Sequence, residues 1–390
     1  MKQQTKAMMK VHKIGNRNFG LTAAIFAAGC LAFGAKAGTV TTTQTVDGVK
    51  WQLVINTSSH ADLRTARLGI GANINTSEAA RMAVLEGLPE RLIVPSIFTI
   101  DGIDYPVTEV AARSFARNRT GKVYDIVFPL DIDILFKANV FISSSISNIL
   151  FKGSSTVAGG AAVQTYSTLT LPALAGDAPD YTQSIVSSCA GVNAIVVGPN
   201  VKVDDKGKLA NLFPAATGAV LLVPRNVGNM SWDGSDQIAL GGTGNTVAYY
   251  GPAEAFDIEM HDTYVTFIPN TANGLSDALG WAQTFKTAFD IDSRINITNR
   301  LEMTAAVTEA MLQNVTLAAP PWYITFAVQT QTQLDNALAA VQADVPVIID
   351  IDGATENIVV PDNREVAILA KSGWTFQRKV KSVGIVISFK

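Results

Sequence analysis

The chain contains little cysteine, little histidine and no surplus of positive charge. Of its 390 residues, 2 are Cys and 3 are His, and 30 Lys and Arg stand against 33 Asp and Glu. The cysteine count excludes a disulfide-dense scaffold, and zinc sites need clusters of Cys and His that this chain does not supply. Without a basic cluster, neither nucleic acid nor an anionic membrane is a predicted partner. Apolar residues make up 48% of the chain, which predicts a folded protein.

Residue sets for catalysis are equally sparse. His60 and His261 are the histidines beyond the amino-terminal segment, and neither lies in an H-x-x-x-H or G-x-S-x-G context. A Ser/His/Asp triad through His261 is the alternative, because a triad is defined by geometry and not by sequence position. Carboxylate pairs such as Asp131 and Asp133 lack the further ligands of a calcium loop and are typical of solvated turns. The prediction is a protein that is not an enzyme, with no catalytic residues, no metal site and no cofactor.

Residues 1–37 have the pattern of a secretory signal peptide. A basic start precedes an apolar run from Gly20 to Gly34, and Ala35-Lys36-Ala37 supplies the small–x–small cleavage pattern. The run is short and rich in Ala and Gly for a membrane span, so a retained signal anchor is the alternative. Lipidation of Cys30, whose preceding residues loosely resemble a lipobox, is a second alternative. The predicted location is secreted or cell surface after cleavage near Ala37, with no transmembrane span in the mature chain.

Cleavage would make the protein acidic. Residues 1–37 hold 6 of the 30 Lys and Arg and no Asp or Glu, which leaves 30 − 6 = 24 basic residues against 33 acidic ones. Cys189 would then be the one remaining cysteine, so no intrachain disulfide could form. Stability must therefore come from buried apolar surface, for which about 350 residues are ample.

Short apolar strands, four of the five ending in proline, recur through the middle of the chain. They are Leu92–Pro95, Ile126–Pro129, Asn148–Lys152, Asn193–Pro199 and Ala219–Pro224. The 70 positions from Pro129 to Pro199 are close to three units of 23. A unit of that length cannot bury its apolar side alone and must stack on copies of itself. An irregular β-sandwich whose strands happen to end in proline is the alternative.

At these residues the chain resembles the BspA-type leucine-rich repeats of bacterial surface proteins. Val107-Thr-Glu-Val110 leads to Ser114-Phe115, where the family has Ala-Phe, and Cys189 begins the Cys-x-x-L-x-x-V spacing of the family. The match covers roughly residues 90–225 and is degenerate, because the segment 153–186 does not fit the pattern. The resemblance implies a leucine-rich-repeat solenoid with a binding role at the cell surface.

The predicted fold class is mainly β with some α. It consists of a signal peptide at 1–37, an N-terminal β cap at 38–90, a degenerate leucine-rich-repeat-like solenoid at 91–265 and a C-terminal α+β domain at 266–390. The cap is predicted from two alternating segments that flank Asp47-Gly48, a strong hairpin signal. Helical periodicity predicts helices at 275–289, 301–312 and 332–340, and a short helix at 78–86.

Alternation along the repeated strands predicts a ligand-binding stripe. Counting back from the terminal proline, side chains such as Ile126, Phe128 and Val197 face inward and the intervening ones face outward. Stacked outward positions would form an apolar stripe with polar edges, which is typical of interaction surfaces. The candidate ligand-binding residues are Tyr124, Val127, Asn148, Leu150, Asn193, Val196 and Leu222. The alternative is that loops or a neighbouring domain cover the stripe.

The leading functional hypothesis is a secreted or cell-surface module for protein binding or adhesion, without catalytic activity. Its ligand would be a protein or, alternatively, a glycan, and the sequence does not specify an oligomeric state. The second hypothesis is a structural subunit of an extracellular assembly. The third is a polysaccharide-active β-helix enzyme, suggested by the Q-L-x-x-A-L helix at 333–338 and the short strands that follow it.

Overall fold

A computed structural model describes a set of segments within one compact unit, Ala37–Lys390. The described residues are 38–71, 82–116, 122–130, 132–153, 167–172, 184–186, 189, 191–205, 208, 218–227, 230–231, 243–251, 253–297, 323–340, 347–351, 354–361, 366–369, 376–379 and 386–389. The predicted signal peptide, Cys30 and the predicted helix at 301–312 lie outside the described residues. No helix in the described segments is long and apolar enough to cross a membrane.

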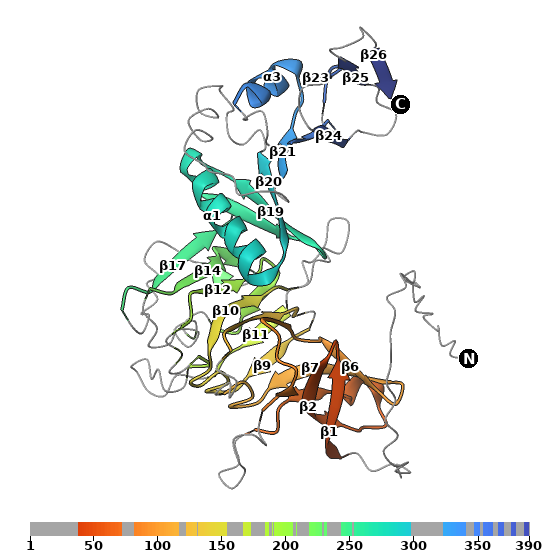
Figure 1. Ribbon diagram of the computed structural model, residues 1–390, viewed down its shortest axis with the longest axis vertical. Helices are drawn as coiled ribbons and strands as arrows, with labels where there is room; N and C mark the ends of the chain where they lie inside the picture. The colour runs from red at the N-terminus through yellow and green to blue at the C-terminus, as the bar shows by residue number, and fades with distance from the viewer. Residues whose placement is uncertain are drawn as a thin grey trace, which may run out of the picture. The chain divides into compact units, whose positions relative to one another are not determined.

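The first half of the chain contributes a nine-stranded sheet, called sheet A (Figure 1). Its main path runs β1-β2-β3-β7-β9-β11-β13, with β4 beside β2 and β6 beside β7. The predicted hairpin at Asp47-Gly48 joins β1 to β2, and both turn residues have positive φ, as a two-residue hairpin turn requires. The strands are β1 (Thr39–Val46), β2 (Val49–Asn56), β3 (Ala66–Leu68), β4 (Val84–Glu86), β6 (Ile97–Ile100), β7 (Ile103–Val110), β9 (Ile134–Phe136), β11 (Ser167–Thr170) and β13 (Val201–Val203).

The predicted apolar strands lie side by side, together with β17, in a second sheet, called sheet B. All six of its strands are parallel, in the order β17-β14-β12-β10-β8-β5. The apolar strands therefore pair with one another in chain order. The strands are β5 (Arg91–Ile93), β8 (Tyr124–Phe128), β10 (Ile146–Phe151), β12 (Ala194–Val197), β14 (Val220–Pro224) and β17 (Thr246–Tyr250).

The chain alternates between the two sheets from β8 to β14, because β9, β11 and β13 of sheet A separate the successive strands of sheet B. Ile126 aligns with Ile149, a step of 23 positions, and Ile149 aligns with Ile195, a step of 46. The predicted three units between Pro129 and Pro199 are therefore wrong. The chain makes two steps there, since β10 pairs directly with β12 and the intervening β11 belongs to sheet A.

A hydrophobic core lies between sheets A and B. The inward prediction is confirmed for Ile126, Phe128 and Val197, which are 0–1% exposed in this core. Phe128 packs on Phe136 of sheet A with ring centroids 5.0 Å apart, and on Phe151 of sheet B at 5.7 Å. Large aromatic side chains therefore join the two sheets.

The second half of the chain forms a mixed sheet and one long helix. The order β18-β19-β20-β21-β22-β24 is parallel except for the antiparallel β18–β19 pair. Helix α1 (Ala272–Phe289) begins at the cap residue Thr271, whose hydroxyl accepts a hydrogen bond from Gly274 N, and packs on β19 and β20 (Figure 1). The strands are β18 (Phe256–Met260), β19 (Tyr264–Pro269), β20 (Asp292–Ile297), β21 (Tyr323–Ala327), β22 (Val347–Asp350) and β24 (Val366–Leu369).

The remaining elements are short. They are η1 (Ala61–Leu63), α3 (Gln331–Ala340), the pair β15 (Asn226–Val227) and β16 (Met230–Ser231), and the sheet of β23 (Val359–Pro361), β25 (Phe376–Lys379) and β26 (Val386–Phe389). The predicted helices at 275–289 and 332–340 fall within α1 and α3. The predicted helix at 78–86 is wrong at its described end, because Val84–Glu86 pairs with β2 as a strand and this pairing overrides the local helical pattern. The expectation of a mainly β protein with some α is confirmed.

Candidate functional site

The predicted apolar stripe is an internal interface. Val127, Leu150, Val196 and Leu222 align across β8, β10, β12 and β14 as the alternation predicts. Their exposed fractions are nevertheless 5%, 0%, 1% and 0%, because they belong to a hydrophobic cluster that includes Phe285 of α1. The prediction of a solvent-exposed stripe is therefore wrong for these four residues. A parallel sheet is usually covered on both faces, so its strands are apolar at successive positions.

The three polar members of the predicted stripe have different environments. Tyr124 is 2% exposed and lies in the core between sheets A and B, because it shares strand parity with Ile126 and Phe128. Its placement on the outward face was therefore wrong, and burial raises the pKa of its hydroxyl far above the usual range. Asn148 is half-buried and donates a hydrogen bond from Nδ2 to Asp125 Oδ1 at 2.7 Å. Asn193 is exposed, as predicted.

The histidine with the strongest local interactions is His261. Its ring stacks on Tyr264 with centroids 4.2 Å apart, and the guanidinium of Arg294 lies 3.5 Å from the same Tyr264 ring. Its Nε2 lies 4.0 Å from Glu259 Oε2. Desolvation by burial lowers the pKa of His261 below its usual value, opposed by Glu259. The described surroundings are thus aromatic and ionic, with no serine hydroxyl hydrogen-bonded to the imidazole among the described residues.

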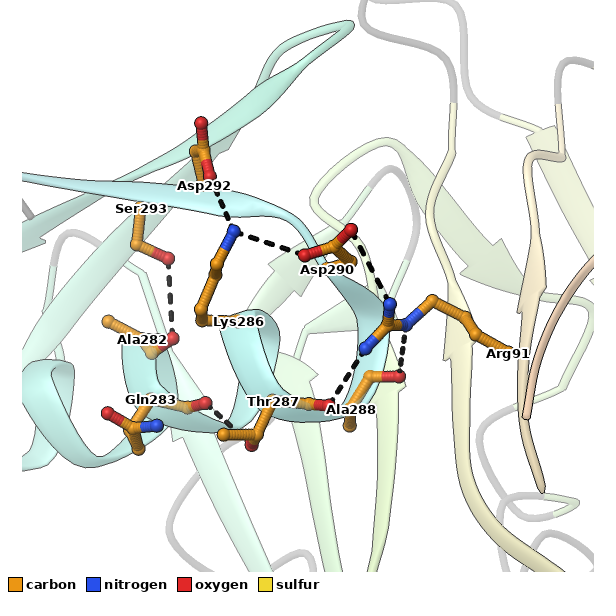
Figure 2. A network of polar contacts seen from close by, with 9 residues as sticks. All are labelled: Arg91, Ala282, Gln283, Lys286, Thr287, Ala288, Asp290, Asp292 and Ser293. Carbon is orange, nitrogen blue, oxygen red and sulfur yellow. Dashed lines mark hydrogen bonds and ion pairs between the residues drawn. The ribbon is translucent and has the colours of Figure 1, made fainter. Parts of the chain in front are cut away.

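An arginine on sheet B binds the carboxyl end of α1 (Figure 2). Arg91 of β5 donates from Nε to Ala288 O at 2.8 Å and from Nη2 to Thr287 O at 2.9 Å. Its Nη1 lies 3.5 Å from the carboxylate of Asp290, the left-handed residue at which the helix ends. The last carbonyls of a helix lack intrahelical partners and carry partial negative charge, so a cation stabilises them. Arg91 therefore holds the carboxyl end of α1 against sheet B. The side chains that α1 covers there, Val127, Leu150, Val196 and Leu222, are called the buried row.

A lysine extends this network on α1 (Figure 2). Lys286 Nζ lies 3.1 Å from Asp290 Oδ1 and 3.0 Å from Asp292 Oδ1. These hydrogen bonds raise the pKa of Lys286, and the one to Asp290 lowers the pKa of that carboxylate. Ser293 Oγ donates to Ala282 O at 3.4 Å. Arg91 and Lys286 contact two carboxylates and two helix carbonyls, so the charges of the network balance. Its role is to connect α1 to sheet B.

Sheet A retains an open face. Every second residue of β2 is buried, and the intervening residues are half-exposed. On β1 the odd-numbered residues are exposed and lie opposite these half-exposed residues of β2. Sheet A therefore has one face on the core and one face in solvent, as mixed and antiparallel sheets often do. This solvated side is called the outer face.

One row of the outer face crosses six strands. Each member is registered with the next, and the row runs Thr41, Val54, Arg67, Glu109, Leu135 and Thr170. Arg67 Nη1 lies 3.8 Å from Glu109 Oε1, and Arg67 Nη2 donates to Ile70 O at 3.1 Å. The row thus has a neutralised ion pair at its centre, an aliphatic side chain on each side and a threonine at each end.

This row, called the outer row, has solvent-accessible aliphatic and hydroxyl groups, whereas the apolar residues of the predicted stripe on sheet B are buried. Aliphatic and hydroxyl groups on a rigid, half-exposed surface suit contacts with a protein or with the polar and apolar faces of a sugar. The row is hard to recognise in the sequence because β9 and β11 have only three and four residues, too few for a clear alternation. The signal that could have found it is Thr at every second position in Thr39–Thr45, continued by Thr168 and Thr170.

Comparisons with known proteins give one structural neighbour. No family model matches the chain, and no curated protein matches it. Among solved structures, the chain is similar to one described as the crystal structure of the pneumococcal vaccine antigen PcpA, at 10% sequence identity and a TM-score of 0.23. The match covers 85% of this chain and 78% of that chain. A likeness at this TM-score is too weak to assign a fold or a function.

Proposed function

We propose that the protein is a secreted or cell-surface module for protein binding or adhesion, and that the outer row of sheet A is its binding surface. The single observation that carries the proposal is the burial contrast between the sheets. The predicted apolar stripe of sheet B is covered by α1, whereas the outer row, from Thr41 to Thr170, is registered across six strands and is exposed at Thr41 and half-exposed at its other five residues. Contiguous accessible rows on a rigid sheet are where a repeat-built protein binds its ligands.

The proposal includes a degenerate leucine-rich-repeat-like solenoid at 91–265, between an N-terminal cap at 38–90 and a C-terminal α+β domain at 266–390. The observation in its favour is that the chain alternates between sheets A and B from β8 to β14. Such stacks present extended surfaces made of one side chain from each successive strand. Export directed by residues 1–37 as a signal peptide would place this surface outside the cell.

The outer row can be tested with two variants that differ only in which apolar side chain they replace. Leu135→Asp puts a charge in the outer row, and Ile93→Asp puts the same charge on β5, where Ile93 is 61% exposed and outside the row. The probes are purified mucin, which presents protein and glycan together, and an array of neutral and acidic glycans. Binding is measured by biolayer interferometry, and folding by circular dichroism.

The expected result is that wild type and Ile93→Asp bind a probe while Leu135→Asp loses at least about tenfold in affinity, since an interface of this kind excludes an unpaired charge. Equal binding by both folded variants would place the ligand elsewhere on the molecule. No binding by wild type to mucin or to any glycan would overturn adhesion to this ligand class. It would then favour the alternative, a structural subunit of an extracellular assembly.

A further inference from the structure

The outermost strand of sheet A has an edge that no described strand covers. β1 pairs with β2 along all eight of its residues, and no other described strand pairs with it. Its sequence, Thr39-Val-Thr-Thr-Thr-Gln-Thr-Val46, contains no charge, no proline and no glycine, and its pairing with β2 has no bulge. Charged residues, prolines, bulges and short length are the devices by which natural sheets block edge-to-edge pairing. β1 uses none of them.

The free backbone groups of this edge belong to the odd-numbered residues. In an antiparallel pair, successive residues direct their N–H and C=O groups alternately toward and away from the partner strand. The two-residue hairpin makes Val46 and Val49 the first hydrogen-bonded pair, so the residues of β1 that bond to β2 are the even-numbered ones. Thr57 N donates to Gly38 O at 2.9 Å, which continues this even-numbered series to the residue before β1. The N–H and C=O groups of the odd-numbered residues therefore point away from β2. These residues are Thr39, Thr41, Thr43 and Thr45.

We propose that two copies of this chain pair through the free edges of β1, antiparallel, about a two-fold axis at Thr43. Residues with free backbone groups must face each other, which requires odd positions to oppose odd positions. With the axis at Thr43, Thr41 of one copy faces Thr45 of the other, and Val40 faces Val46. About six backbone hydrogen bonds form, two from each opposed pair of odd-numbered residues between 41 and 45. The contact is isologous, so it closes as a dimer.

This register is favoured over its two neighbours by side-chain matching. Moving the axis to Thr42 would place Val40 opposite Gln44, and moving it to Gln44 would place Val46 opposite Thr42, whereas the axis at Thr43 places Val40 opposite Val46 and Thr41 opposite Thr45. Cross-strand pairs of β-branched residues and of threonines are favourable. The axis at Thr43 places Thr42 of the second copy across from Gln44, whose side chain is held by its own chain because its Nε2 donates to Thr99 O of β6 at 2.6 Å.

The charges beside β1 are compatible with a second copy. Lys50, the neighbour of Thr45 on β2, is paired with Glu86 at 2.8 Å, so the border of the edge brings no unpaired like charges together. If residues 1–37 are cleaved, the α-ammonium group of Gly38 lies close to Asp47 of the second copy in this register. One strand pair buries less area than the roughly 1,200 Å² of a stable interface, so the dimer is weak and reversible. The inference is independent of which ligand the outer row binds.

Two double variants test the register directly. Thr41→Lys with Thr45→Lys opposes lysine to lysine across the two-fold axis, whereas Thr41→Lys with Thr45→Glu opposes lysine to glutamate. Both variants change the same two exposed positions, but Lys50 lies opposite Thr45 on β2, so Thr45→Lys faces a like charge within its own chain and Thr45→Glu an opposite one. The free energy of unfolding of each variant is therefore measured by urea unfolding, and dimerisation is compared at concentrations where both variants are fully folded. Dimerisation of the purified full chain is measured by sedimentation equilibrium between about 1 μM and 1 mM, the range expected of a weak interface.

The expected result is a wild-type dimer, a dissociation constant at least about tenfold higher for the Lys/Lys variant, and one within about threefold of wild type for the Lys/Glu variant. Thr43→Pro is a second test, because it removes an N–H group that faces away from β2, and Thr43→Val is its control. Thr43→Pro should weaken the dimer and Thr43→Val should preserve it. A wild-type monomer throughout this range, or equal dimerisation by the two double variants, would overturn the proposal.

Discussion

The row buried between sheet B and α1 gives the sharpest prediction about stability. Leu150 lies at its centre, flanked in register by Val127 and Val196, and is fully buried in the cluster that contains Phe285 of α1. Leu150→Ala removes three carbon atoms from this interface. We expect the free energy of unfolding to fall, because the helix and the strands on either side cannot both move to close the space.

The magnitude follows from complete burial. Leu→Ala substitutions in cores cost about 2–5 kcal/mol, and a site between a sheet and a helix should lie near the middle of that range, at about 3–4 kcal/mol. Ile93→Ala is the matched control. Ile93 is registered with Val127 in the same row but is 61% exposed, so its replacement should cost less than about 1 kcal/mol.

The assay is urea unfolding followed by far-ultraviolet circular dichroism and by tryptophan fluorescence, with coincident transitions as the condition for comparing free energies. Leu150→Lys should be more damaging than Leu150→Ala, because it buries an unpaired charge. A Leu150→Ala variant within about 1 kcal/mol of wild type would refute the buried interface and restore the solvent-exposed stripe predicted from the sequence.

Three further predictions concern single groups. Arg91→Ala should cost about 1–3 kcal/mol of unfolding free energy, because two helix carbonyls lose a cationic donor, and Arg91→Lys should recover only part of it. Gly198→Ala should destabilise strongly, since a Cβ there would lie 2.0 Å from Lys152 O, whereas Gly280→Ala in α1 meets nothing within 4 Å and should stabilise by about 0.5–1 kcal/mol in thermal unfolding. Burial lowers the folded-state pKa of His261 below its unfolded value of 6.5, so its contribution to stability is present above pH 6.5 and lost as the pH falls below it. His261→Gln should therefore show a smaller fall in melting temperature between pH 7.5 and pH 5.5 than wild type.

Much of the fold could be predicted because local patterns matched it. The Asp47-Gly48 turn, the apolar strands that end near proline, and the periodicity of Leu275–Phe289 each carry a signal within a few residues of sequence. Each signal corresponds to an element in the structure: the β1–β2 hairpin, the strands of sheet B and helix α1. Elements can be predicted from sequence where the local residue pattern agrees with the final fold, as it does at these three places.

The candidate site could not be predicted in the same way, because it depends on long-range packing. Alternation correctly separated Phe128 from Val127, but both side chains are apolar, and nothing near them in sequence indicates that α1 covers the second. The cover comes from Leu275–Phe289, well over a hundred residues later. Tyr124 was a different error, since its parity with Phe128 already placed it inward.

The hydrogen bonds from Arg91 to the end of α1 also bear on the order in which the chain folds. Arg91 and Ala288 are separated by 197 positions, so their contact closes a loop that contains all the other strands of sheet B. Contacts at such separation form only after the intervening chain has been ordered, because closing the loop earlier costs entropy that nothing yet offsets. Docking of α1 onto β5 should then be a late event, absent from the transition state for folding. Loss of Arg91 would accelerate unfolding and leave the folding rate nearly unchanged, so this arginine would set how long the native state lasts and not how quickly it forms.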